Sequence, residues 1–421
     1  MIIPSIDISE GRAVQLRRGR ELVLEGGDPL DRLAEFSVAG EVAVIDLDAA
    51  RGTGDNGDLI RTMVRRARCR VGGGIRSVGS ARDWLDAGAE RVIVGTAASV
   101  ELCGQLPRDR VIAAVDAEHG EVVVDGWETA TGVPVLDLIR RLAPVVGGFL
   151  FTQVEHEGAM SGFDLKRVEA AVEAAGDARV TAAGGVTTAD DVAALHALGA
   201  DAQVGMALYS GRMSLGAAIA APLAKPVDGT LWPTVVVDEL GTSLGLVWST
   251  RESLEEAVAQ RRGIYWSRSR DELWAKGESS GNTQDLLAVD LDCDDDALRF
   301  TVHQHGTGFC HTGARSCWEA GFSLGSLERV IAERILSAPS GSGTSLLLED
   351  PKLLAAKILE EAGELVSATS SDEVIHETAD LLYFALVRLK GAGARLADVE
   401  RELGLRNGRV RRRTMAAKET R

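Results

Sequence analysis

The sequence contains no apolar run close to the roughly 18 residues that a membrane-spanning helix requires. Its first residues, Met1 to Ile6, also lack the basic segment and long apolar stretch of a secretory signal peptide. Cysteine is scarce, with 5 residues in a chain of 421, which excludes a disulfide-stapled framework. These absences predict a cytoplasmic protein without a membrane partner.

Basic residues are outnumbered, since 46 Lys and Arg stand against 63 Asp and Glu, and the net charge at pH 7 is -17. This charge argues against general binding to nucleic acid, although local sites can still hold small anions. The apolar content of 45% and the charged content of 26% are ordinary for a globular protein and exclude a mainly disordered chain. The length predicts about two to four domains.

Aromatic residues make up only 4% of the chain, but five of the seven tryptophans lie between residues 230 and 320, together with three of the five cysteines. A Pro/Gly segment at 225–230 precedes this stretch, and a Ser/Gly segment at 338–345 follows it. The other two cysteines, Cys69 and Cys103, are predicted to pack inside the first block. Three blocks are therefore predicted, at 1–225, 231–320 and 325–421.

Block one alternates short apolar segments with amphipathic stretches, which indicates a parallel sheet covered by helices. Eight such segments fit a (β/α)₈ TIM barrel, and a doubly wound open sheet is the competing topology. The predicted strands are 2–6, 42–45, 68–71, 91–94, 111–115, 148–152, 179–183 and 202–204.

Block one also repeats itself. Asp7 is matched 109 residues later by Asp116, and the Gly73-Gly74 pair is matched 111 residues later by Gly184-Gly185. Two similar half-barrels would place both aspartates at strand ends on the face where the active sites of such barrels lie. The two carboxylates would then be a general base and a general acid.

Symmetric glycine turns flank these aspartates and would present backbone N–H groups to two phosphates of one substrate. The alternative is that the glycines only permit tight turns and that the aspartates only cap strand ends. The turn residues are Gly73, Gly74 and Gly95 in the first half, and Gly184, Gly185 and Gly205 in the second.

Several segments of block one resemble the histidine-pathway ProFAR isomerase family. The resemblance implies that Asp7 and Asp116 are base and acid of an Amadori rearrangement, and that Thr96 joins the phosphate-binding turns. The sister cyclase of this pathway shares the half-barrel plan, and a dual isomerase that also serves tryptophan synthesis stays open. The matching segments are 4–16, 46–48, 72–76, 94–96, 183–186, and Asp116 with 125–127.

One segment departs from that family. The family has Thr-Asp-x-x-Arg-Asp-Gly after the sixth strand, where this chain has Thr152, Glu157 and Gly158 at the first, sixth and seventh positions and His156 in place of the arginine. Thr152 and Glu157 are predicted catalytic residues, with the negative charge kept at position 157.

Block two carries two sets of metal-ligand residues. Asp292, Asp294 and Asp296 would project to one face of an extended chain, as a hard cation such as Mg²⁺ prefers. Three cysteines, Cys293, Cys310 and Cys317, would leave one zinc position for water. The alternatives are a solvated acidic turn and buried thiols.

The surrounding residues resemble phosphoribosyl-AMP cyclohydrolase over about 231–320. The resemblance implies that the cysteines bind Zn²⁺ across a homodimer interface, that the aspartates bind Mg²⁺, and that water attacks the adenine ring. Arg268, Arg270 and Lys276 are predicted phosphate contacts. His311 is predicted to be a proton carrier or, alternatively, a structural donor.

Block three reads as helical from residue 351 and carries acids at i, i+3 spacing. Glu361 and Glu364 share one helix face, and Glu377 and Asp380 share another. Antiparallel packing would gather the four carboxylates around Mg²⁺, and a solvated acidic face is the alternative. This pattern resembles the all-α phosphoribosyl-ATP pyrophosphohydrolases, although their Ser-Tyr-Thr reads Ser-Gly-Thr here, at 342–344.

Together the three resemblances predict a trifunctional enzyme of histidine biosynthesis that acts on small phosphoribosyl nucleotides and forms at least a homodimer. The basic tail, 406–421, is predicted to be a solvated end, with a nucleic-acid arm as the alternative. The rival interpretation of the whole chain is that one or more domains are silent and serve assembly or regulation.

Overall fold

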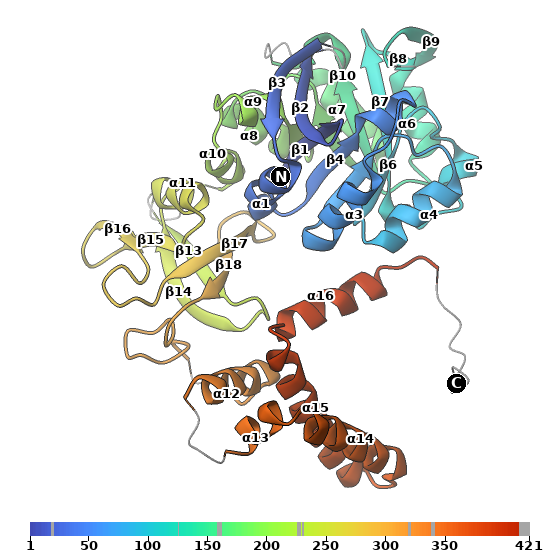
Figure 1. Cartoon of the computed structure of the whole chain (residues 1–421). Helices are drawn as coiled ribbons and strands as arrows, with labels where there is room; N and C mark the ends of the chain where they lie inside the picture. The colour runs from blue at the N-terminus through green and yellow to red at the C-terminus, as the bar shows by residue number, and fades with distance from the viewer. Residues whose placement is uncertain are drawn as a thin grey trace. The chain divides into compact units, whose positions relative to one another are not determined.

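Two compact units make up the chain, one of Met1–Cys317 with Leu405–Arg421 and one of Trp318–Gly404. In this computed structural model the described residues are 1–17, 21–124, 126–157, 162–224, 229, 231–318, 321–337 and 342–411 (Figure 1). The predicted linker at 225–230, apart from Gly229, and the tail beyond 411 lie outside these residues, as do Gly158 and Asp125.

The first part of unit one is a closed barrel of eight parallel strands, which confirms the (β/α)₈ prediction and rules out the open sheet. The barrel is closed by two parallel pairings, one between the strands that begin at residues 2 and 201 and one between the strands that begin at residues 111 and 148. The barrel strands are β1 (Ile2–Ser9), β4 (Val42–Asp46), β5 (Cys69–Gly72), β6 (Arg91–Val94), β7 (Val111–Glu118), β10 (Gly148–Gln153), β11 (Arg179–Ala183) and β12 (Asp201–Val204).

Helices cover the outside of the barrel, and their apolar residues follow the helical period. One of them buries Val135, Ile139 and Leu142, the i, i+4, i+7 stripe that faces a core. Cys69 and Cys103 are fully buried in the same core. The principal helices are α1 (Pro29–Phe36), α3 (Gly57–Arg66), α4 (Val78–Ala87), α6 (Val135–Leu142), α7 (Leu165–Ala175), α8 (Ala189–Ala197) and α10 (Leu215–Ala220).

The sequence repeat is also present in space. β1 continues into a hairpin of β2 (Arg12–Arg17) and β3 (Glu21–Gly27), and β7 continues into one of β8 (Glu121–Val124) and β9 (Thr129–Pro134). Helices α4 and α8 each begin with a capping box. The two hairpins were not predicted, because the sequence analysis ended these strands at residues 6 and 115.

Glu41 closes an ion-pair cluster at the N-terminal ends of the strands. Its carboxylate lies 2.7 Å from Arg70 and also pairs with Arg91, and the side chains of Glu41 and Arg70 are almost fully buried. Burial raises the pKa of Glu41, but the two guanidinium groups outweigh burial and hold this pKa below its ordinary value.

Glu41→Ala is therefore expected to lower the free energy of unfolding of the barrel by about 3–5 kcal/mol, because it leaves a buried guanidinium unpaired. Denaturant titration followed by circular dichroism measures this loss. Since the pKa is lowered in the fold, the Glu41 contribution is present above pH 4.5 and is lost as the pH falls through the folded pKa. Glu25→Ala, at an exposed pair with Arg12, is the control and should change stability little; an equal effect of both variants would contradict the argument.

The second part of unit one is a six-stranded sheet in the order β16-β15-β14-β13-β18-β17. The pair of β13 and β18 is parallel, and the other pairs are antiparallel. Its elements are β13 (Trp232–Val237), β14 (Ser243–Ser249), α11 (Arg251–Gln260), β15 (Ile264–Ser267), β16 (Glu272–Ala275), β17 (Gln284–Leu291) and β18 (Leu298–Gln304).

This sheet packs directly on the barrel. Helix α11 crosses α10 closely at Gly216, where a Cβ atom would lie only 2.7 Å from the Cα of Glu255. The indole of Trp232 donates a hydrogen bond of 2.8 Å to the carbonyl of Ala224. The barrel and the sheet therefore share one hydrophobic core.

Unit two is helical, as predicted for the third block. Helices α14 and α15 are joined by three residues and pack against each other. No described helix of the chain has both the length and the apolar content needed to cross a membrane. The helices are α12 (Leu324–Ser337), α13 (Gly343–Glu349), α14 (Pro351–Ser367), α15 (Ser371–Gly391) and α16 (Leu396–Asn407), the last of which ends in unit one.

Candidate active sites

A cavity of about 820 Å³ opens at the C-terminal ends of the barrel strands. Asp7 enters it from β1 and Asp116 from β7, the two strands that begin the half-barrels. Thr152 at the end of β10 and Glu157 after it also line the cavity. The barrel thus brings together the four residues that were predicted as its catalytic groups.

The three carboxyl groups of this cavity all have pKa values above their ordinary range. Burial raises the pKa of Asp7 to about 6, and a hydrogen bond of 3.0 Å from the Ser5 hydroxyl offsets burial only in part. Burial also raises the pKa of Asp116, against hydrogen bonds from Trp127 and Thr152. Burial, followed by repulsion from both aspartates, raises the pKa of Glu157 to about 7. Such a group of acids can both accept and donate a proton.

All the predicted phosphate-binding residues of the barrel line the same cavity: Gly73, Gly74, Gly95, Thr96, Gly184, Gly185 and Gly205. Two of the turns require glycine because of their backbone conformation, whether or not a phosphate binds there. Gly73 has φ +96° and Gly185 has φ +97°, and a Cβ atom would lie 2.1 Å from a backbone oxygen at Gly73 and 2.2 Å from one at Gly185. The repeated glycines can therefore serve both purposes that were considered as alternatives. They permit the tight turns, and these turns lead into the N-termini of α4 and α8, where backbone N–H groups are available to a phosphate.

Several cavity residues were missed by the sequence analysis, among them Ser5, Gln15 and Trp127. Ser5 could have been found, since it lies two residues before Asp7 and so shares its strand face. Trp127 lay in a segment that was matched to Asp116 but was given no role, because its φ of +69°, a left-handed conformation that a bulky residue rarely adopts, cannot be read from the sequence. That turn lets Trp127 bond to Asp116.

In the sheet, Cys310 and Cys317 lie within hydrogen-bond reach of each other. The Thr312 hydroxyl donates to Cys310 Sγ over 3.2 Å and lowers the pKa of this thiol, whereas burial and the neighbouring Cys310 raise that of Cys317. His311 is exposed, with Nδ1 3.7 Å from Cys310 Sγ. A divalent cation would favour the thiolate form of both cysteines.

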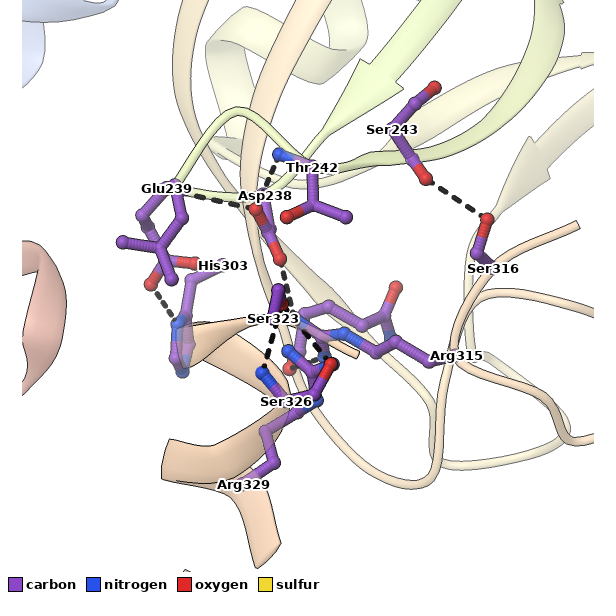
Figure 2. Close-up of polar contacts among 12 residues, drawn as sticks. Asp238, Glu239, Thr242, Ser243, His303, Arg315, Ser316, Ser323, Ser326 and Arg329 are labelled. Atoms are coloured by element: carbon purple, nitrogen blue, oxygen red, sulfur yellow. Dashed lines mark hydrogen bonds and ion pairs between the residues drawn. The ribbon is translucent and has the colours of Figure 1, made fainter. Parts of the chain in front are cut away.

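Figure 2 shows what holds this cysteine loop in place. Arg315 reaches the buried Asp238 over 3.3 Å, and the Ser316 hydroxyl donates to the Ser243 carbonyl over 2.9 Å. Cys317 N donates to the Leu244 carbonyl over 2.8 Å. The two thiols are therefore fixed against the edge of β14.

Cys293 does not join the other two cysteines within one chain. Among the described residues, two groups place three ligand atoms within 4.8 Å of one another, and neither contains a cysteine. Cys293 is exposed in the loop between β17 and β18. Within one chain, the described residues therefore do not bring the three predicted thiols into one group.

The first of these groups is Asp292, Asp294 and Asp296. The carboxylate of Asp292 accepts hydrogen bonds of 3.0 Å from the backbone N–H groups of Asp296 and Ala297. Repulsion from Asp294 raises the pKa of Asp296. Three exposed oxygens that repel one another fit a hard cation such as Mg²⁺.

The predicted phosphate contacts of the sheet occupy different environments. Arg268 is exposed and lies 4.6 Å above the Trp248 ring, and Arg270 is exposed and pairs with Glu272 over 3.3 Å. Lys276 is buried, with its ammonium 5.5 Å from the Phe309 ring, beside the two cysteines of the loop. Burial lowers the pKa of Lys276, and Cys317 opposes this effect. The position of Lys276 suits contact with the thiolates better than contact with a solvated phosphate.

The second group lies in unit two and contains Glu361 of α14 with Glu377 and Asp380 of α15. Burial, Glu364 and Asp380 raise the pKa of Glu361, while burial and Glu364 raise the pKa of Glu377. Helix packing thus gathers three of the four predicted acids into one cluster, and the fourth, Glu364, lies near enough to raise the pKa values of Glu361 and Glu377. A cation would relieve the repulsion among them.

Thr344 occupies the Ser-Gly-Thr segment that departs from the pyrophosphohydrolase pattern. Its side chain is buried, and its hydroxyl lies 2.9 Å from the hydroxyl of Tyr383 on α15. Ser342 caps α13 through the N–H of Ser345. These two residues have structural bonds that do not depend on the missing aromatic.

Comparisons with known sequences follow this organisation. Residues 1–214 match the family described as histidine biosynthesis protein, residues 245–319 match phosphoribosyl-AMP cyclohydrolase, and residues 324–407 match phosphoribosyl-ATP pyrophosphohydrolase.

Three curated relatives match different shares of the chain. The 1-(5-phosphoribosyl)-5-((5-phosphoribosylamino)methylideneamino)imidazole-4-carboxamide isomerase of Methanocaldococcus jannaschii is 34% identical over 232 residues, which are 52% of this chain and 98% of that protein. The histidine biosynthesis trifunctional protein of Neurospora crassa is 40% identical over 74% of this chain and 37% of its own length. The histidine biosynthesis bifunctional protein of Schizosaccharomyces pombe is 49% identical over 45% of each chain. The chain thus spans less than half the length of these fungal relatives.

Proposed function

Because the chain belongs to the histidine biosynthesis protein family, we propose that it catalyses three reactions of that pathway. In order, it removes pyrophosphate from phosphoribosyl-ATP, opens the adenine ring of phosphoribosyl-AMP, and isomerises the resulting ProFAR aminoaldose to an aminoketose. We assign these reactions to residues 325–421, 231–320 and 1–225. The order of the three family matches along one chain supports this assignment most strongly.

Isomerisation takes place at the barrel mouth. Asp116 delivers a proton to the ring oxygen of the aminoaldose, and Asp7 removes a proton from C2 to give the enolamine. The observation that supports this step is the pairing of two buried carboxyls with raised pKa values between two glycine turns in one cavity. Glu157 serves as a third proton-holding group, and Thr152 orients Asp116.

Ring opening takes place at the cysteine loop. Zn²⁺ would be held by Cys310 and Cys317 of one chain and Cys293 of a second copy, and Mg²⁺ by Asp292, Asp294 and Asp296; zinc would supply a water of lowered pKa. Lys276 stabilises the thiolates, Arg268 and Arg270 meet the phosphate, and His311 moves a proton. We infer that the protein works as a homodimer or larger assembly, because the described part of one chain does not bring the three thiols into one group. We also infer a reducing compartment such as the cytoplasm, since all five cysteines are free within the chain.

Pyrophosphate removal takes place at the helical cluster, where Glu361, Glu364, Glu377 and Asp380 would hold Mg²⁺ and orient water toward the linkage between the α and β phosphates. The convergence of these acids from two helices supports this assignment.

The direct test of all three activities is to supply phosphoribosyl-ATP to the purified protein with Mg²⁺ and Zn²⁺ and to identify the products. We expect pyrophosphate and the aminoketose. Accumulation of phosphoribosyl-AMP would identify a silent second domain, and accumulation of ProFAR a silent barrel. Unchanged substrate would contradict the proposal for the helical domain.

Glu361→Gln is expected to slow Mg²⁺-dependent pyrophosphate release by about a hundredfold or more, because it removes a buried ligand of the cation. A coupled pyrophosphate assay measures this rate. Glu360→Gln is the matched control. The carboxylate of Glu360, next to Glu361 in the chain, pairs with Lys357 over 2.8 Å and lies outside the cluster. Equal rates for wild type and Glu361→Gln would remove the cluster from the mechanism.

The isomerase is expected to have a bell-shaped dependence of kcat/KM on pH. Activity should rise as the pH passes about 6, where Asp7 loses its proton, and should fall at higher pH as the acid loses its own; Glu157, with a pKa of about 7, loses its proton in the same range. Glu157→Gln removes a negative charge beside Asp116, so the falling limb should move to lower pH. Glu155→Gln, outside the cavity, should leave it in place, and a flat profile would contradict the acid-base assignment.

A further inference from the structure

The acidic loop of the sheet, residues 292–296, is held by the barrel. His196, in the last turn of α8, approaches Asp295 with Nε2 2.6 Å from Oδ2. The backbone N–H of Ala224 donates to the carbonyl oxygen of Asp295 over 2.8 Å. Two barrel groups therefore fix the central part of a loop that the sheet alone would leave between β17 and β18.

Asp295 differs from its neighbours in direction and in backbone. Its φ is +61°, a left-handed conformation, and its side chain is partly buried. Asp292, Asp294 and Asp296 are exposed and converge within 4.8 Å. The loop thus turns one carboxylate toward the barrel and presents three to solvent.

On the barrel side of this contact, the surroundings of His196 restrict the orientation of its ring. His196 follows Leu195, which is fully buried, and its own side chain is only 25% exposed. In the described part of the chain its other ring nitrogen, Nδ1, is buried without a hydrogen-bond partner. Asp295 is therefore the polar group that sets the orientation of the ring.

Convergent carboxylates repel one another, so an unsupported loop would spread them apart, and a cation would have to order it on binding. A contact that orders the loop before the cation arrives reduces the free-energy cost of ordering that binding would otherwise include. The free energy of one hydrogen bond to a charged group corresponds to a change of about tenfold in the affinity for the cation.

We propose that His196 of the barrel is a positioning residue for the cation site of the cyclohydrolase domain, because its bond to Asp295 orders Asp292, Asp294 and Asp296 before the cation binds. This inference rests on the proposed function, since it takes the three aspartates as the Mg²⁺ ligands. It explains how the barrel contributes to a reaction that takes place outside it.

The first test measures the loop itself. His196→Ala should increase hydrogen–deuterium exchange of the peptide that contains residues 292–298 in the full chain without added divalent cation. His196→Gln keeps an N–H donor and should restore protection. His305→Ala, which breaks the matched pair of His305 with Asp285 in the same sheet, should leave this peptide unchanged.

The second test measures the cation, with Mn²⁺ as the probe and a Glu361→Gln/Asp380→Asn background that removes the helical site. His196→Ala should raise the Kd for Mn²⁺ about tenfold, and His196→Gln should restore it within about twofold. Isomerase activity should stay at the background value, since His196 is not among the residues that line the cavity.

Unchanged exchange and unchanged Mn²⁺ affinity in His196→Ala would overturn the proposal. Increased exchange with unchanged affinity would also overturn it, because loop order would then not serve the cation. If the parent protein binds no Mn²⁺ at the three aspartates, the Mg²⁺ assignment of the proposed function fails; exchange then shows separately whether His196 orders the loop.

Discussion

Asp7→Asn is expected to lower the kcat of ProFAR isomerisation by roughly a thousandfold, because the amide cannot accept the proton from C2. Asn has the shape of Asp and can still accept the 3.0 Å hydrogen bond from Ser5, so the cavity should keep its form. Asp116→Asn should have an effect of similar size, since the amide cannot deliver a proton to the ring oxygen.

The other two reactions provide an internal control for these variants. Release of pyrophosphate and opening of the adenine ring should proceed at the parent rates, and ProFAR should accumulate when phosphoribosyl-ATP is supplied. Asp137→Asn, at an exposed carboxylate that pairs with Arg140 over 3.0 Å, should isomerise normally. Normal isomerase turnover in both Asp7→Asn and Asp116→Asn would sink the assignment of the barrel mouth.

Cys310→Ala is expected to abolish bound zinc and ring-opening activity, because one of three thiolate ligands is lost. Elemental analysis of the purified protein measures the metal, and a chromatographic assay for ProFAR measures the reaction. Cys103→Ala is the control, since that thiol is buried in the barrel and burial raises its pKa. Unchanged zinc in Cys310→Ala would remove the cysteine loop from the site.

A mixing experiment tests whether two chains share each zinc ion. Cys293→Ala and Cys310→Ala should both be inactive alone. Unfolding and refolding them together should restore roughly a quarter of the parent ring-opening activity, since half of the dimers are mixed and each has one intact site of two. No recovery, with zinc retained in Cys293→Ala, would show that Cys293 is not a ligand.

Much of the barrel could be predicted from the order of residues. Its eight strands were found because a parallel strand covered on both faces is a short continuous apolar run between polar helical stretches. Their ends were found less well, because β1 and β7 run on past their apolar parts into hairpins whose residues alternate or are exposed. A local pattern indicates a strand where it is buried, and not where it continues into solvent.

The chemistry of the sites divides in the same way. The identity of Asp7, Asp116 and the acids of α14 and α15 followed from repetition and from i, i+3 spacing. The environment of Lys276 did not, since nothing near it in the chain indicates that Phe309 and two cysteines surround it. Burial of a charged side chain depends on segments that are distant in sequence.

The sequence by itself determined the three blocks, the barrel, and the residue types that are proposed to carry each reaction, because periodicity and repetition are properties of the chain. Only the tertiary structure decided which groups meet. Closure of the barrel brings Asp7, Asp116 and Glu157 into one cavity, where the loss of water raises their pKa values together. Packing of the barrel on the sheet joins His196 to Asp295. Desolvation and contact between distant segments arise only when the chain is folded, so no local pattern can encode them.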